Sequence, residues 1–148
     1  NPGGWIDPWG LVHEETEGYH VYALYDVSAD GKVADKPYYV GITNDITRRT
    51  GEHIDSGRLT GDRNTKIEPL QTNVTYGQAR GYEQAYIEHY ETRNGEIGKP
   101  TSQSNRGNKY NSFETDSKKT KRPQARQDYF TKYYNEMKNK LKGGKPCQ

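Results

Sequence analysis

Three side chains that suit the chemistry of phosphate esters lie close together between residues 38 and 53. Tyr39, Arg49 and His53 supply a phenol, a guanidinium and an imidazole. Arg49 and His53 are four residues apart, so on a helix they would share one face. A guanidinium binds phosphate oxygens through parallel N–H groups, while a phenol or an imidazole can move a proton. We therefore interpret this stretch as a candidate phosphate-ester site; the alternative is a surface helix with two solvated basic side chains.

The segment that carries these residues has the pattern of a strand followed by a helix. Residues 37–42 are aromatic and β-branched, and Gly41 marks a point where a second backbone or a ligand can come close. A residue within 43–45 can cap a following helix through Arg49 and His53. The helix would begin at the end of the strand, which places its basic face beside Tyr39.

A second strand is predicted over residues 19–27, before this segment. A loop joins the two strands, so we expect an antiparallel hairpin. Tyr22 and Tyr39 would then lie on neighbouring strands of one sheet face. A third strand over residues 65–75 is interrupted by Pro69, which predicts that this strand lies at an edge of the sheet.

A helix is predicted over residues 78–92, because apolar residues recur there at steps of three and four. Its stripe consists of Ala79, Tyr82, Tyr86 and Tyr90. Glu83 lies one residue beyond Tyr82, on the flank of the stripe, so its carboxylate can point along the sheet. Glu88 and Glu91 are competing carboxylates, and we expect both in solvent.

Another helix is predicted over residues 123–141, which begin with a proline and repeat apolar residues at steps of four. The predicted buried stripe consists of Ala125, Tyr129, Tyr133, Met137 and Leu141, widened by Phe130 and Tyr134. Its lysines would face outward.

This end of the chain is strongly basic. From Lys118 to Gln148, ten Lys or Arg stand against two acidic residues, a local charge of +8 that leaves −6 over residues 1–117. Such asymmetry indicates an arm that binds a nucleic-acid backbone or an acidic partner; the alternative is a solubilising tail. The backbone contacts are assigned to Lys118, Lys119, Lys121 and Arg122.

The composition indicates one domain with a small core. Only 29% of the 148 residues are hydrophobic, so the 13 tyrosines must supply much of the buried area, with their hydroxyls reaching water or a partner. We expect marginal stability, helped by a partner protein. Cys147 is the only cysteine, which excludes a disulfide within the chain and a cysteine-based metal site. No apolar run has membrane-spanning length and no leader is visible, so any export address is expected on a larger parent chain.

Several of these segments resemble the GIY-YIG nuclease family. His20-Val21-Tyr22 and Tyr39-Val40-Gly41 are similar to its paired triplets, although His20 replaces a glycine and valine replaces isoleucine in both. Arg49 lies ten residues after Tyr39, where the family has an arginine on a helix, and His53 lies where homing endonucleases carry a histidine. The segment 83–87, Glu-Gln-Ala-Tyr-Ile, resembles the one whose glutamate holds a divalent metal.

The family also has an asparagine after the glutamate helix, in the pattern N-x-x-N-S-hydrophobic. Residues 108–113 fit this pattern, so Asn108 is assigned to the site, with Asn105 and Asn111 as alternatives. A carboxamide there would donate a hydrogen bond to a phosphate oxygen. The alternative is turn chemistry, which asparagine serves equally well.

The resemblance implies an α+β fold, a small three-stranded antiparallel sheet flanked by helices, here with a C-terminal amphipathic helix. It also implies a metal-dependent endonuclease, with DNA favoured over RNA as substrate. Glu83 would hold Mg²⁺, with Mn²⁺ as the alternative, and Arg49 would bind the non-bridging oxygens. Tyr22 or Tyr39 would accept a proton from water, its pKa lowered by the metal and Arg49, while His53 assists.

The first residues resemble a second family. Trp5, Asp7, Pro8, Gly10 and Leu11 match the junction W-x-D-P-x-G-L that precedes the toxin of Rhs/YD-repeat polymorphic toxins. This resemblance implies a junction over 1–11 and a toxin domain over 12–148, with its motif core at about 19–113 and its basic tail at 118–148. It also implies secretion within a larger Rhs shell, action in the cytoplasm of a target cell, and a cognate immunity protein.

Two other functions are compatible with the basic tail and the aromatic residues. The protein could bind nucleic acid without cutting it, or it could dock onto a partner protein. An RNA-cleaving toxin of the same fold is the third alternative.

Overall fold

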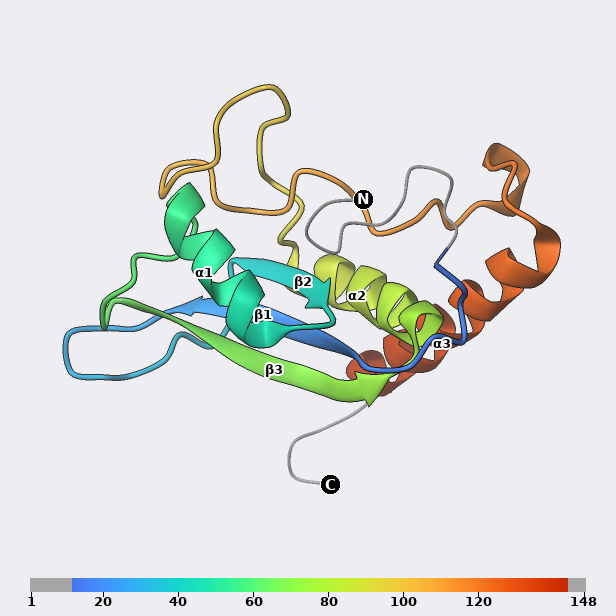
Figure 1. The fold of residues 1–148 in the computed structure, drawn as a ribbon, viewed down its shortest axis with the longest axis horizontal. Coiled ribbons are helices and arrows are strands. Elements are labelled where there is room, and N and C mark those ends of the chain that lie inside the picture. Colours follow the sequence, from blue (N-terminus) through green and yellow to red (C-terminus); the bar gives the residue numbers. More distant parts are fainter. Residues whose placement is uncertain (1–11, 144–148) are drawn as a thin grey trace.

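The computed structural model describes residues 12–143, so the predicted junction at residues 1–11 lies outside it (Figure 1). The strands are β1 (Tyr19–Asp26), β2 (Tyr39–Thr43) and β3 (Thr65–Val74), and the helices are α1 (Ile46–Ser56), α2 (Tyr76–Tyr90), the short 3₁₀ helix η2 (Ser117–Lys119) and α3 (Gln124–Gly143). The strands form one antiparallel sheet in the order β2-β1-β3. The predicted α+β fold with a C-terminal helix is confirmed.

The register of the hairpin places the two candidate phenols on one face of the sheet. Tyr22 pairs with Gly41 and Leu24 pairs with Tyr39, so all four lie on the same face. Tyr22, Leu24 and Tyr39 pack there with Leu59, which follows α1. The prediction that Tyr22 and Tyr39 share a face is confirmed, and β3 lies at an edge as its proline predicted.

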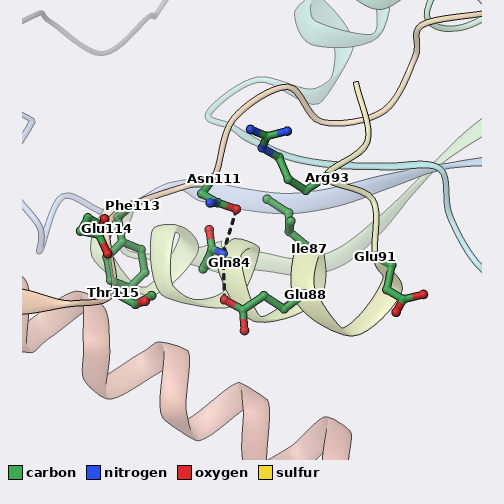
Figure 2. A pocket seen from close by; sticks show the side chains of 9 residues that line it. All are labelled: Gln84, Ile87, Glu88, Glu91, Arg93, Asn111, Phe113, Glu114 and Thr115. Carbon is green, nitrogen blue, oxygen red and sulfur yellow. Dashed lines mark hydrogen bonds between the residues drawn. The ribbon is translucent and has the colours of Figure 1, made fainter. Parts of the chain in front are cut away.

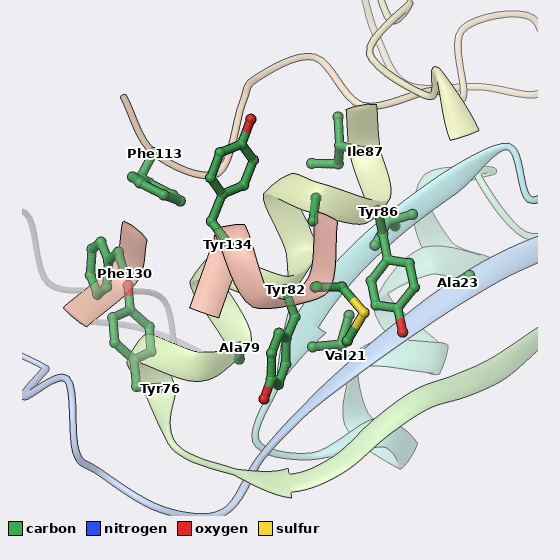
Figure 3. Packing of buried hydrophobic residues seen from close by; sticks show 13 residues of the cluster. Val21, Ala23, Tyr76, Ala79, Tyr82, Tyr86, Ile87, Phe113, Phe130 and Tyr134 are labelled. Carbon is green, nitrogen blue, oxygen red and sulfur yellow. The ribbon is translucent and has the colours of Figure 1, made fainter. Parts of the chain in front are cut away.

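The opposite face of the sheet carries the larger core. Val21, Ala23 and Val40 pack there against α2, and α3 packs on α2 from the outside (Figure 3). Gly81 allows this close helix pair, because a Cβ at Gly81 would lie 2.5 Å from the carbonyl oxygen of Phe130. The core consists largely of rings, as the composition predicted.

Hydrogen bonds satisfy the tyrosine hydroxyls at the edges of this core. The Tyr134 hydroxyl donates to Glu88 at 2.6 Å, and the Tyr82 hydroxyl donates to Glu136 at 3.4 Å.

Within residues 12–143 no helix is long and apolar enough to cross a membrane.

Local hydrogen bonds set where the helices begin. Asp45 is the residue that caps α1, because its carboxylate accepts from the backbone N–H of Arg48 at 3.0 Å. Helix α2 begins two residues before the predicted Gln78, since Thr75 and Gln78 form a capping box around its first turn. It ends at Tyr90, because Glu91 adopts a left-handed conformation.

The buried face of α3 matches the predicted one in part, because Phe130, Tyr134 and Met137 are buried as predicted. Gln127, Phe130, Tyr134 and Met137 are its buried residues, whereas Ala125 is exposed and Tyr129 and Tyr133 are only partly buried. The observed steps of three and four follow the helical repeat, while constant steps of four drift around the helix. Gln127 tolerates burial because its amide donates to the Glu114 carbonyl and its oxygen accepts from Arg122.

Candidate functional site

A pocket of about 510 Å³ lies where β2, α1, α2 and the loop 108–112 meet. Its lining residues include most of the predicted site: Tyr39, Ile42, Arg49, Arg58, Arg80, Glu83, Asn108, Lys109, Tyr110, Asn111 and Ser112. Four of them are cations and one is a carboxylate, so the pocket suits an anionic group. The predicted residues Tyr22 and His53 lie behind its wall, against Tyr39 and Arg49.

A hydrogen-bonded chain connects three of the predicted residues. The Tyr22 hydroxyl lies 2.6 Å from Nε2 of His53 and accepts from Nε of Arg49 at 3.3 Å. Arg49 also binds Glu52 through Nη1 at 2.8 Å. Strand β1 and helix α1 thus bring a phenol, an imidazole and a guanidinium together across 31 residues of sequence.

Burial is the largest influence on the pKa values of Tyr22 and His53 in this hydrogen-bonded group. It raises the pKa of the Tyr22 phenol well above its usual value, Tyr39 acts in the same direction, and Arg49 opposes them only in part. Arg49 thus acts in the predicted direction on the phenol pKa of Tyr22, but burial outweighs it. Burial also lowers the pKa of His53 to about 3, with smaller contributions from Arg49 and Arg58. The imidazole is neutral at physiological pH, so its Nε2 can accept the hydroxyl proton of Tyr22.

Gly41 leaves room for the phenol of Tyr22 to reach His53. A methyl group at Gly41 would lie 2.6 Å from Cζ of Tyr22 and would overlap its hydroxyl oxygen. The close approach that the sequence predicted at Gly41 is thus the approach of the opposite strand's phenol, not of a ligand.

Replacing Gly41 with alanine is expected to displace Tyr22 from His53. Tyr22 is fully buried and cannot move into solvent, so overpacking should cost about 1–3 kcal/mol of the free energy of unfolding. Chemical denaturation measures this loss. Gly51→Ala is the control, because a methyl group there meets no atom within 4 Å. Equal stability of the two variants would contradict the close packing.

Glu83 is the carboxylate that faces the pocket, on the second turn of α2. Burial raises its pKa to about 6, while a hydrogen bond from Ser112 and the charges of Arg80 and Arg49 act to lower it. Arg80 donates to the backbone oxygen and the hydroxyl of Ser112, so this arginine and serine fix the loop that faces Glu83. The competing Glu88 and Glu91 are exposed, as predicted.

The side chains of this pocket suit a Mg²⁺ ion that keeps several waters better than a metal ion held by three or more protein ligands. Among residues 12–143 no group of three or more His, Cys, Asp or Glu side chains could hold a metal ion. Mg²⁺ is commonly bound through one or two carboxylates, with several waters and the substrate phosphate completing its shell. The single carboxylate of Glu83, in a pocket that is also lined by four cationic side chains, fits that kind of site.

Asn108 has a role that the sequence did not indicate. Its carboxamide accepts from the Val40 N–H at 3.0 Å and donates to the Val40 carbonyl at 2.7 Å, while its oxygen also accepts from Thr92. It thereby pairs with the outer edge of β2 as another strand would. The oxygen and one N–H of the carboxamide are engaged, so this side chain fixes the pocket wall, and its contact with a phosphate oxygen stays a prediction.

The two alternative asparagines differ in position. Asn105 binds the backbone of its own loop through Glu96, Lys99 and Pro100. Asn111 is exposed, lines the pocket, and accepts from Gln84 at 3.2 Å. Of the three, Asn111 is the asparagine with an exposed amide at the pocket.

Two arginines in the pocket were not predicted. Arg80 lies three residues before Glu83, and this spacing on one helix could have indicated it. Arg58 follows the cap of α1 and lies with its guanidinium 4.0 Å from the ring centroid of Tyr39. No sequence pattern indicates Arg58, because its position depends on how the chain turns after Gly57.

The predicted basic tail divides into two kinds of side chain. Lys118, Lys119 and Lys121 are exposed, as a surface for a polyanion requires. Arg122 is partly buried and packs over Phe130, with its guanidinium 5.2 Å from the ring centroid. Burial and the nearby Arg80 and Arg126 lower its pKa. Arg122 therefore contributes to packing as well as to charge.

A second pocket, of about 540 Å³, lies beside the loop 111–115 (Figure 2). Gln84 separates the two pockets, since it binds Asn111, Glu88 and the N–H of Ser112. The second pocket is lined by three glutamates and only one arginine, Arg93, which disfavours a phosphate. The first pocket is therefore the candidate site, although the second is slightly larger.

Comparison with known families gives one match. The family model of the GIY-YIG catalytic domain matches residues 18–129, most of the chain and all of the pocket described above. No curated protein and no solved structure gives a significant match.

Proposed function

Because the chain belongs to the GIY-YIG family, whose members are nucleases that usually use divalent metal ions, we propose that it is a Mg²⁺-dependent endonuclease with DNA as its favoured substrate. The observation that carries this proposal is the pocket itself. It combines the Arg49–Tyr22–His53 chain with Glu83 and further cations around a space of about 510 Å³.

Arg49 is proposed to bind the non-bridging oxygens of the scissile phosphate. Its Nε contacts Tyr22 and its Nη1 contacts Glu52, which fixes the plane of the guanidinium in the pocket that Arg49 lines. Charge develops on these oxygens in the transition state, where a preoriented cation stabilises it.

Proton transfer is proposed to pass through Tyr22. Its hydroxyl lies behind the pocket wall and contacts an acceptor, the neutral imidazole of His53, so it would give its own proton to His53 as it receives one from a water that reaches it from the pocket. This exchange removes the need for a free tyrosinate, which burial makes unfavourable. Tyr39 lines the pocket with its ring and would orient the substrate.

Glu83 is proposed to hold the metal ion. When bound, the ion would supply Lewis-acid stabilisation of the phosphate and of the leaving oxygen. Arg80 and Ser112 orient the loop and the carboxylate, while Asn108 holds the wall of the pocket against β2.

A panel of substrates tests the activity and its alternatives. The purified protein is incubated with plasmid, linear DNA and total RNA, with Mg²⁺ and with a chelator. Cleavage of DNA in Mg²⁺ supports the proposal, and cleavage of RNA alone would reassign the substrate. Metal-independent binding without cleavage would favour a binding module, and no affinity for either nucleic acid would favour a partner-docking domain.

The biological context is proposed from the resemblance of residues 1–11 to an Rhs-type junction. In that proposal the domain is the toxin of a secreted Rhs protein, acts in the cytoplasm of a target cell and is neutralised by an immunity protein. Induced expression in bacteria should stop growth, and the Glu83→Gln protein should not. Unimpaired growth at high levels of intact wild-type protein would count against the toxin role.

The basic tail is proposed to contribute affinity without contributing chemistry. Replacing Lys118, Lys119 and Lys121 with glutamine should weaken binding and reduce the slope of log Kd against log salt by up to about one per lost phosphate contact. Arg122 is kept because it packs on Phe130. Binding titrations over a salt series measure the slope, and single-turnover assays at saturating DNA should give an unchanged rate. Normal binding with much slower cleavage would place the tail in the active site.

A further inference from the structure

Two arginines stack on two consecutive tyrosines. The guanidinium of Arg106 lies 3.8 Å from the ring centroid of Tyr38, and that of Arg58 lies 4.0 Å from the ring centroid of Tyr39. The backbone connects the two stacks, because Nε of Arg58 donates to the carbonyl of Arg106 at 3.0 Å and the Tyr38 hydroxyl donates to the carbonyl of Arg58 at 2.6 Å. The stacks are therefore similar in construction.

The two arginines differ in their counter-charge. Arg106 binds the carboxylate of Asp26 through both Nη atoms, at 2.7 and 2.5 Å. Arg58 forms no ion pair with any carboxylate in residues 12–143, although only 8% of its surface is exposed. It lines the candidate pocket, and Arg106 does not.

An unpaired guanidinium in a buried position is unfavourable unless something compensates for its lost hydration. Stacking on Tyr39 and one hydrogen bond to a carbonyl compensate only in part. The pocket already contains Arg49, Arg80 and Lys109, which add repulsion, while Glu83 is its only carboxylate. An anion that enters the pocket would supply the missing counter-charge.

We propose that Arg58 binds a phosphate group of the nucleic acid, as a second guanidinium beside Arg49 in the same pocket. This inference rests on the proposed nuclease function, whose family motifs do not include Arg58. Arg106, by contrast, has its charge satisfied by Asp26 and serves only to hold the loop against β1.

The position of Arg58 has a consequence for proton transfer. Besides burial, the charges of Arg49 and Arg58 lower the pKa of His53. A phosphate bound to both guanidiniums would offset those charges and raise the pKa of the imidazole, so His53 would accept a proton more readily with substrate present than without it. Binding and activation would be coupled through the same two arginines.

The test compares Arg58→Gln with Arg106→Gln, its matched control, both in the Glu83→Gln background so that DNA is bound but not cut. A fluorescent DNA duplex is titrated over a series of salt concentrations. Loss of one charged phosphate contact should weaken binding by Arg58→Gln about tenfold to a hundredfold and reduce the log–log salt slope by about 0.9. Arg106→Gln should keep both the affinity and the slope, although its melting temperature should fall.

Unchanged affinity and slope in folded Arg58→Gln protein would overturn the inference, and so would equal losses in the two arginine variants. If Arg58→Gln does not fold, Arg58→Lys decides: the retained charge should keep the salt slope, while loss of the planar fork weakens binding. A normal affinity of the Arg58→Lys protein would then overturn the proposal that the planar guanidinium of Arg58 binds a phosphate. Cleavage by the wild-type protein is measured in parallel, so failure of the nuclease function is distinguished from failure of this inference.

Discussion

Replacing Glu83 with glutamine is expected to lower the rate of DNA cleavage at least about a thousandfold, the effect of losing several kcal/mol of transition-state stabilisation. Glutamine keeps the shape and the acceptor toward Ser112 but loses the charge that a hard cation requires. Burial raises the pKa of Glu83, so its carboxylate disfavours the folded state above pH 6, and the variant should be at least as stable as the wild type at neutral pH.

Single-turnover cleavage and the melting temperature measure the two parts of this prediction. Glu91→Gln is the matched control, because Glu91 is exposed at the end of the same helix and does not line the candidate pocket. It should retain full activity. Wild-type cleavage by folded Glu83→Gln protein would remove Glu83 from the site.

If Glu83 holds the metal ion, the Mg²⁺ requirement for cleavage should depend on pH. The carboxyl group of Glu83 is half protonated near pH 6, and protons compete with the metal for it. The Mg²⁺ concentration that gives half-maximal cleavage should therefore rise as the pH falls below about 6. A requirement for Mg²⁺ that is constant between pH 5 and pH 8 would contradict Glu83 as the ligand.

Replacing Tyr22 with phenylalanine is expected to lower the catalytic rate by about a hundredfold or more, the usual contribution of a general acid or base. The change removes the hydroxyl that contacts both His53 and Arg49. The ring stays, so the sheet face keeps its packing, while the buried imidazole loses a partner at a cost of about 1–3 kcal/mol. DNA affinity should change little, because Arg49 and Arg58 remain.

Tyr39→Phe is the matched control for this prediction. Its ring remains available for the stack with Arg58, and its hydroxyl is not part of the chain between Arg49 and His53. Rates at saturating DNA should fall much less for Tyr39→Phe than for Tyr22→Phe. If Tyr39→Phe lowers the rate more than Tyr22→Phe does, Tyr39 transfers the proton and Tyr22 only positions neighbouring groups.

The sequence predicts the hairpin and its faces well, because strand alternation is a local property. The strands follow from composition, and the register of the hairpin then places Tyr22 and Tyr39 on one face. Helix starts were less accurate: the capping box of Thr75 and Gln78 moves the start of α2 by two residues, and the pattern of α3 could be read with its buried face rotated. The first difference arises from a side-chain contact that a hydrophobic repeat does not describe, and the second from constant steps of four, which drift around a helix.

The site was only partly predictable, for reasons of tertiary structure. Arg49, His53 and Glu83 lie at helical positions near recognisable motifs, so their convergence could be expected. Arg58 lies in a loop, and only the folded chain shows that it lines the pocket and forms no ion pair with a carboxylate of residues 12–143. Asn108 fits a sequence pattern, yet its carboxamide is engaged by the edge of β2, which no pattern in the loop reveals.

The central claim is that this pocket hydrolyses phosphodiesters with the help of a metal ion held by Glu83. The most direct measurement is the conversion of supercoiled plasmid to nicked and linear DNA by the purified wild-type protein, with Mg²⁺ titrated from a chelated, metal-free start. We expect no conversion in the chelator and a rate that rises with Mg²⁺ to a plateau. Conversion that is equally fast in the chelator, or none at any concentration of Mg²⁺ or Mn²⁺, would contradict the claim.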